Sequence, residues 1–99
     1  MAKYDVCRNL NGAGFLLDVQ ADLLDGLNTR IVVPLLPAKE APTPAKRLNP
    51  SFEIEGARFV MATQFLAAVP ASILSAPVSN LSNRFDDITN ALDMVFQGF

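Results

Sequence analysis

Residues 81–99, with the sequence LSNRFDDITNALDMVFQGF, form the stretch that decides how this chain folds. Apolar side chains recur in it at steps of three and four residues, which places them on one face of a helix. These apolar positions are Leu81, Phe85, Ile88, Leu92, Val95, Phe96 and Phe99. Asp86 and Asp87 lie near the expected start, where negative charge suits the helix dipole, and Asn80 or Ser82 can cap it. Gly98 then ends the helix.

Two interpretations fit this terminal stretch. In the first, the helix closes the hydrophobic core and Phe99 packs inside the protein. In the second, the terminal tripeptide, residues 97–99, is a contact surface for a partner. Residues beyond a helix stop add little to the helix hydrogen-bond ladder, whereas an exposed phenylalanine can bury much apolar area against another protein.

The chain before this helix is predicted to consist of short strands joined by turns. The expected strands are residues 4–8, 15–20, 30–35, 51–54 and 58–61. The first two form a hairpin around residues 9–14, which are rich in Asn and Gly, and the last two form a hairpin around Glu55-Gly56. Pro34 cannot donate a ladder hydrogen bond, so we expect it at a strand end or a sheet edge. Residues 63–69 can extend the second hairpin, and residues 72–78 are a short extended piece.

Two loops stand out between these strands. Residues 22–28 hold the turn signal Asp25-Gly26 and the adjacent pair Leu23 and Leu24, which serve either as anchors into the core or as an exposed contact patch. Residues 36–50 contain four prolines and are expected to be an irregular, mobile surface excursion. A domain linker is the alternative there, but about fifty residues on either side are too few for two good cores.

This order of elements predicts one domain, residues 1–99, of the α+β class. The expected architecture is mainly β: an antiparallel sheet or partial barrel of about five strands, with the C-terminal α-helix covering a face or end of the sheet. A hydrophobic content of 51% is enough to build a core in a chain of 99 residues.

The amino-acid composition argues against several classes of function. The net charge is −2 and no basic cluster exceeds Lys46-Arg47, which argues against direct binding to nucleic acid. The chain has no His, so Ser-His-Asp and Cys-His catalysis are excluded and a zinc site is not expected. The single Cys7, expected in the core, suits a reducing compartment, and no signal peptide or membrane span is recognised. We therefore expect a cytoplasmic binding protein with no catalytic residues, no metal and no cofactor.

Four sequence blocks carry a resemblance to a known family. They are DVQADLLD at residues 18–25, RIVVPL at residues 30–35, Val69-Pro70, and FQGF at residues 96–99. In this order and spacing the chain resembles the CcdB family, plasmid-type toxins of type II toxin–antitoxin systems, over essentially its whole length. The resemblance implies a cytoplasmic homodimer whose subunit has an SH3-like antiparallel sheet and a C-terminal helix.

The same resemblance implies a mechanism and two partners. It implies a poison of DNA gyrase, a topoisomerase, that binds the gyrase A subunit and traps the cleaved DNA–enzyme complex. It also implies a CcdA-type antitoxin whose disordered C-terminal segment wraps the toxin. The gyrase-binding residues carried over by position are Leu23, Leu24, Asp93, Phe96, Gln97, Gly98 and Phe99.

The chain departs from the best-known member of the family at several of these positions. Gln97 stands where that member has Trp, Phe99 where it has Ile, and Asp93 where it has Asn. Glutamine offers less apolar area than tryptophan and adds an amide that must be hydrogen-bonded. Phe65 and Val60 stand where the family prototype carries charged residues near the antitoxin site. These departures bear on which gyrase and which antitoxin the chain recognises.

Two further functions are weighed against gyrase poisoning. Gln97 and Asp93 motivate a homologue that has lost gyrase poisoning and only binds its antitoxin. The related MazF/Kid toxins, which share the fold, cleave RNA. That activity needs a positively charged groove with an acid–base group, whereas Arg8, Arg30 and Arg58 are scattered along this chain.

Overall fold

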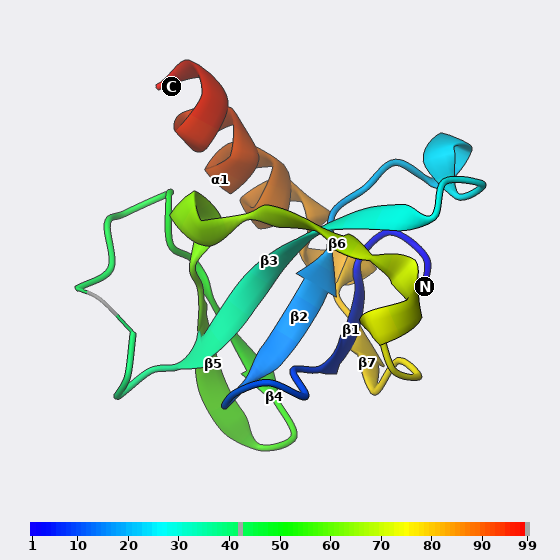
Figure 1. The fold of residues 1–99 in the computed structure, drawn as a ribbon. Coiled ribbons are helices and arrows are strands. Elements are labelled where there is room, and N and C mark those ends of the chain that lie inside the picture. The colour runs from blue at the N-terminus through cyan, green and yellow to red at the C-terminus, as the bar shows by residue number, and fades with distance from the viewer. Residues whose placement is uncertain (42, 99) are drawn as a thin grey trace.

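The computed structural model describes residues 1–41 and 43–98. The described part of the chain forms seven strands and one α-helix, with four short 3₁₀ turns between them (Figure 1). The strands are β1 Asp5–Arg8, β2 Phe15–Asp18, β3 Thr29–Pro37, β4 Ser51–Ile54, β5 Ala57–Met61, β6 Ala67–Pro70 and β7 Ser79–Asn80. The helix is α1 Phe85–Gln97, and the 3₁₀ turns are η1 Asp22–Leu24, η2 Thr63–Phe65, η3 Ala71–Ile73 and η4 Ser82–Arg84.

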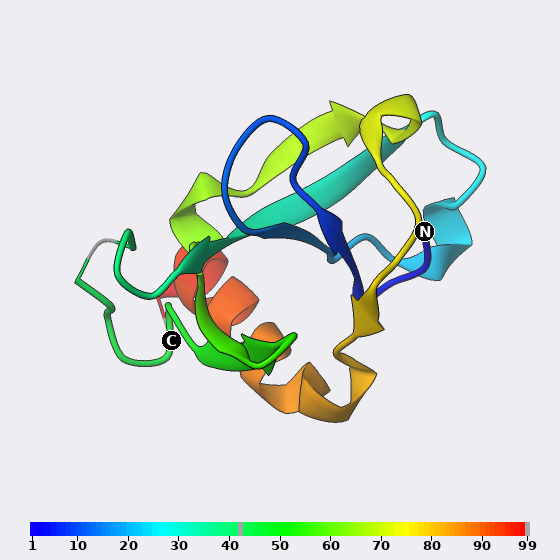
Figure 2. The ribbon, with the colours of Figure 1, turned by 90° about the horizontal axis from the view of Figure 1, so that it is seen from below.

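The strands form one antiparallel sheet in the order β4-β5-β3-β2-β1-β7, and β6 adds to β3 beside β5. The sheet curls into a nearly closed barrel, with α1 running past one end of it (Figure 2). The predicted fold class is therefore confirmed. The sheet has more strands than the five or so expected, because β6 and β7 are short and carry no clear alternation of apolar and polar residues.

Pro34 lies inside β3, so its expected place at a strand end or a sheet edge is wrong. The Val19 N–H donates to the Ile31 carbonyl (3.0 Å) on the β2 side, and the alternation of an antiparallel ladder then points Pro34 away from β2. Its carbonyl indeed accepts from the Ala62 N–H (2.9 Å) on the opposite side. On that side β3 changes its partner from β6 to β5, so the missing N–H leaves the ladder intact.

The two predicted hairpins are present, but residues 63–69 do not extend β5. Glu55 and Gly56 form the β4–β5 turn with positive φ values of 53° and 81°. After β5 the chain turns at η2, where the Thr63 side chain is buried and its hydroxyl donates to the Leu48 carbonyl. This turn redirects the chain, so β6 becomes a second partner of β3. Residues 72–78 hold the end of η3 and a coil, whereas the strand pairing with β1 is at β7.

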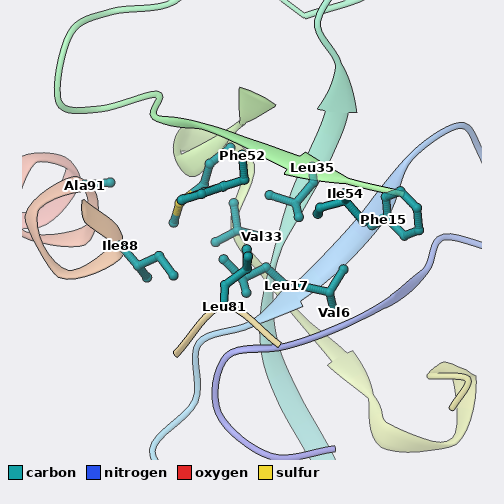
Figure 3. Close-up of a cluster of buried hydrophobic side chains, with 11 residues drawn as sticks. Val6, Phe15, Leu17, Val33, Leu35, Phe52, Ile54, Leu81, Ile88 and Ala91 are labelled. Carbon is teal, nitrogen blue, oxygen red and sulfur yellow. The ribbon is translucent and has the colours of Figure 1, made fainter. Parts of the chain in front are cut away.

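The hydrophobic core fills the barrel (Figure 3). It combines side chains from the sheet with Ile88 and Ala91 of α1, which are fully buried. The sheet and the segment before the helix contribute Val6, Phe15, Leu17, Val33, Leu35, Phe52, Ile54, Met61 and Leu81. Cys7 is also fully buried, as expected for a core residue.

Helix α1 packs against the core through its middle residues Ile88, Ala91 and Leu92. It begins at Phe85, after η4, and its N-cap residue Arg84 makes no side-chain capping hydrogen bond. Asn80 accepts from the Ser82 N–H (2.8 Å) before η4, so the predicted cap by Asn80 or Ser82 is wrong. Phe85 and Phe96 are exposed, so the predicted continuous apolar face is wrong at both positions. The second half of the helix projects beyond the sheet (Figure 1).

The helix ends where predicted, at Gly98. This glycine is left-handed (φ 78°, ψ 11°), and its N–H donates to the Met94 carbonyl (3.0 Å). The first interpretation of the terminal stretch thus holds for residues 88–92 of α1, and the exposure required by the second holds at residues 97–98. The expectation that Phe99 packs in the core or forms a contact lies outside the described residues.

Residues 38–41 and 43–50 contain no helix or strand, as predicted for the proline-rich excursion. The alternative of a domain linker is wrong, because the strands on both sides of it, β3 and β5, pair with each other in one sheet. The mobility of this segment stays a prediction. Within the described residues, no helix has the length and apolar character needed to cross a bilayer.

Candidate partner-binding site

In the connection between β2 and β3, the loop residues 21–28 all lie on the surface. Leu23 is 93% exposed and Leu24 is 47% exposed. Their two competing interpretations are thereby separated: the pair forms an exposed patch and does not anchor the loop in the core. The loop folds on itself through η1, in which the Leu24 N–H donates to the Ala21 carbonyl (2.9 Å).

A buried ion pair lies at the base of this loop. Asp18, the last residue of β2, accepts from Nε of Arg30 in β3 (2.7 Å). Their side chains are 0% and 4% exposed. The two residues flank the loop in sequence, so the pair joins its two ends across the sheet. A buried pair of this kind is held by its mutual attraction and its hydrogen bonds, which offset the desolvation of both charges.

Gln20 extends this pair into the loop. Its backbone N–H donates to Oδ1 of Asp18 (3.0 Å), and its side-chain oxygen Oε1 accepts from the Ile31 N–H (3.2 Å). Its side-chain nitrogen Nε2 donates to the carbonyl of Leu24 (3.0 Å). Gln20 is itself buried. A chain of hydrogen bonds therefore runs from the buried ion pair to the loop residue that follows Leu23.

The electrostatics of the network keep Arg30 charged. The hydrogen bond to Asp18 raises the pKa of Arg30 above its ordinary value, against the opposing effect of burial, and the charges of Asp18, Asp22 and Asp25 act in the same upward direction. Among the described residues, Nη2 of Arg30 is buried and has no hydrogen-bond partner. Arg30 also lines a cavity of about 330 Å³, together with Asp25, Leu27 and residues of the segment 71–77.

The other residues assigned to the site lie at the end of α1. Phe96 is 71% exposed, Gln97 and Gly98 are exposed, and Asp93 is half-buried one turn earlier. The assignment of Phe99 falls outside the described residues. This end of the helix is held by its own backbone ladder and by the Gly98 cap.

An apolar groove of about 320 Å³ joins the loop to the helix end. Leu24 contributes to it from the loop and Phe96 from the helix. The other residues that line it are Val19, Gln20, Ala21, Ile31, Leu66 and Leu92. Two of the assigned residues, far apart in sequence, thus share one surface feature, whereas Leu23, Asp93, Gln97 and Gly98 do not line the groove.

The chemistry of this surface suits contact with an apolar partner group. Every residue lining the groove except Gln20 is apolar. No group of three or more His, Cys, Asp or Glu side chains that could hold a metal ion occurs in residues 1–41 and 43–98. The site is therefore described best as an exposed apolar surface with a single buried amide beneath it.

Asp18, Gln20 and Arg30 lie in the blocks that carry the family resemblance, but no sequence motif marks them as site residues. One signal was available: the acidic Asp18 lies near the end of one predicted strand, the basic Arg30 begins the next, and a loop separates them. Opposite charges at the two ends of one hairpin are candidates for a cross-strand pair. Burial, which makes this pair strong, could not be inferred from that spacing.

The fold and this surface define a small antiparallel barrel protein whose loop and helix end share an exposed apolar groove. The family model described as "CcdB protein" matches residues 3–98, and the chain therefore belongs to the CcdB family, toxins of toxin–antitoxin systems. This confirms the resemblance carried by the four sequence blocks.

A solved structure supports the same fold. It is described as an endoribonuclease in complex with its cognate antitoxin from a mycobacterial species. The match has a TM-score of 0.73 and 14% sequence identity, and it covers 96% of this chain and 93% of that chain. At this identity the likeness shows a shared barrel and helix.

Proposed function

We propose that this toxin binds the A subunit of DNA gyrase and traps the cleaved DNA–gyrase complex. The proposed contact residues are Leu23, Leu24, Asp93, Phe96, Gln97, Gly98 and Phe99. The observation that carries the proposal is the shared apolar groove, because Leu24 and Phe96 line it together although they come from opposite parts of the chain. Membership of the CcdB family supplies the class of target.

The energetics favour this surface as a binding site. Leu23 and Phe96 keep most of their apolar area in water, and burying such a side chain against a partner contributes about 1.5–3 kcal/mol. Two such residues beside a groove resemble the few large apolar anchors that dominate most protein interfaces. Because the loop is held by hydrogen bonds before binding, little conformational entropy is lost when Leu23 docks.

The proposed mode of action is binding and not catalysis. A ribonuclease is the second candidate, since the similar fold described above is named an endoribonuclease. That activity requires free positive charge in a groove. Arg8 pairs with Glu55 (2.7 Å) and Arg30 is buried against Asp18, so two of the three scattered arginines are already neutralised by carboxylates.

A CcdA-type antitoxin is the proposed second partner. The family and the antitoxin-bound structure of a similar fold support it. We also propose a homodimer, because the small barrel leaves several large apolar side chains exposed, among them Phe65, Phe85 and Leu27. Sedimentation should give about twice the 10.7 kDa of one chain, and a 10.7 kDa species at micromolar concentration would count against the dimer.

The decisive experiment combines purified protein, gyrase and supercoiled DNA. We expect protein-dependent accumulation of gyrase-linked double-strand breaks, abolished by prior addition of the antitoxin. Cleavage of RNA without gyrase would instead establish the ribonuclease. Antitoxin binding with neither activity would establish a homologue that has lost its poison function.

A further inference from the structure

The loop that displays Leu23 has few attachments to the rest of the protein. All of its residues, 21–28, are exposed, so side-chain packing holds it weakly. At its two ends, the Lys3 N–H donates to Oδ1 of Asp22 (2.8 Å) and the Ala71 N–H donates to the Asn28 carbonyl (2.8 Å). The hydrogen bond from Gln20 to Leu24 is the one that comes from a buried side chain and reaches the middle of the loop.

We propose that Gln20 is a positioning residue, which holds Leu23 and Leu24 in the geometry that the partner recognises. The proposal rests on the proposed function for its partner, and on the structure alone for its mechanism. Gln20 acts through the carbonyl of Leu24, the residue that follows Leu23, and thereby links the loop to the fixed position of the Asp18–Arg30 pair.

The amide group of Gln20 is suited to this role because it donates and accepts at once. Oε1 accepts from the Ile31 N–H in β3, while Nε2 donates to the Leu24 carbonyl in the loop. One side chain thereby ties the loop to the sheet. The same hydrogen bonds explain why Gln20 can line an otherwise apolar groove. Its amide is hydrogen-bonded to backbone groups, so the groove surface remains apolar.

Gln20→Met tests this directly, since methionine has a similar length and neither hydrogen bond. Gln64→Met is the matched control, because Gln64 is exposed and accepts only from Asn49 in the described contacts. By NMR we expect the order parameters of residues 22–27 to fall in Gln20→Met, and the Leu27 N–H, which donates to the Leu24 carbonyl, to exchange at least tenfold faster. The strands and the control should be unchanged. An equally ordered loop in Gln20→Met would overturn the proposal.

Gln20→Glu provides a rescue that a general loss of stability does not predict. A protonated carboxyl group can donate to Leu24 and accept from Ile31, as the amide does, whereas the ionised form can only accept. Burial raises the pKa of such a group. Loop order in Gln20→Glu should therefore be close to wild type at acidic pH and be lost as the pH rises, while wild-type loop order measured over the same range stays constant. Loop order in Gln20→Glu that does not change with pH would contradict the role of the donor.

The effect of Gln20 on function is tested by measuring binding to the gyrase A subunit by calorimetry, per folded molecule. Gln20→Met should weaken binding roughly fivefold, and it should add no further loss in a background that carries both Leu23→Ala and Leu24→Ala, because the residue acts through these two side chains. Losses that simply add would overturn the positioning role. If the wild-type protein does not bind gyrase at all, the proposed function fails, and the NMR arm still decides whether Gln20 positions the loop.

Discussion

The two halves of the proposed contact surface are held in place by different forces. The loop that carries Leu23 depends on buried side chains outside itself, through Asp18, Arg30 and Gln20. The helix end that carries Phe96 depends on the local backbone ladder and on the Gly98 cap. Both expose a large apolar side chain, 93% for Leu23 and 71% for Phe96, but of the two only the loop is hydrogen-bonded to the Asp18–Arg30–Gln20 network.

Because of this difference, we expect substitutions in the loop's buried supports and substitutions at the helix end to affect stability and partner binding differently. Substitutions in the buried network should act on the loop and on the fold together, because the network lies inside the sheet. Substitutions at the helix end should act on recognition alone, because the second half of α1 projects from the barrel (Figure 1). The predictions below test this division, in order of decreasing expected effect.

Asp18→Ala should have the largest effect. It leaves the buried guanidinium of Arg30 without its carboxylate, and breaking a buried pair in this way costs about 3–5 kcal/mol of unfolding free energy. Asp87→Ala is the matched control, since the Arg84–Asp87 pair (2.8 Å) is about half exposed and should contribute no more than about 1 kcal/mol. Urea unfolding measures both. Equal losses for the two variants would show that the Asp18–Arg30 pair does not hold the base of the loop.

The strands and the helix could be predicted from residue patterns, because the spacing of apolar residues along the sequence reflects the local backbone conformation. Both hairpins, the helix end at Gly98 and the core position of Cys7 were found in this way. The change of partner along β3 could not be predicted, since it depends on where η2 turns the chain. This is why Pro34 was wrongly placed at an edge and residues 63–69 were assigned to β5.

The candidate site was predictable only in part, and for a physical reason. The family resemblance supplied Leu23, Leu24 and the helix-end residues, but helical periodicity placed Phe85 and Phe96 on the core face. Ile88 and Ala91 in the middle of the helix pack in the core, whereas Phe85 and Phe96 lie near its two ends and stay exposed. Periodicity reports which residues share a face, and not how much of that face is covered.

Deleting residues 98–99 should abolish gyrase inhibition and leave folding nearly intact. In the described residues the deletion removes one capping hydrogen bond, from Gly98 to Met94, which contributes about 1 kcal/mol to stability. Loss of an apolar contact of phenylalanine size from the complex costs on the order of 1.5–3 kcal/mol of binding free energy. Urea unfolding and a gyrase cleavage assay on the same variant measure the two effects.

A core position of Phe99 predicts the opposite result for this deletion. If Phe99 were a core residue, its loss would lower the unfolding free energy by about 3 kcal/mol or more. Reduced stability with unchanged inhibition per folded molecule would assign the tail to the core and remove it from the contact surface.

Leu23→Ala should weaken gyrase binding by roughly tenfold, which corresponds to about 1.4 kcal/mol, with no measurable loss of stability. The side chain is almost entirely exposed in the free protein, so its removal leaves the fold unchanged. Leu10→Ala is the control, because Leu10 is similarly exposed in the β1–β2 turn and does not line the groove. Similar losses of affinity for the two variants would mean that exposed leucines bind without preference for the loop.

Gln97→Trp should give the smallest effect, and it is the one expected gain. Gln97 is exposed on the last turn of α1, next to Phe96, which lines the groove. The family's best-known member has an aromatic residue at this position, and tryptophan buries more area than glutamine with no amide left to satisfy. Stronger gyrase binding by about 1 kcal/mol, or roughly fivefold, is therefore expected, with unfolding unchanged because the side chain faces solvent.

Gln64→Trp, at an exposed position outside the groove, controls for nonspecific adhesion of the indole ring. Unchanged affinity in Gln97→Trp would mean that the helix end docks without this residue, and would leave the loop as the dominant half of the surface.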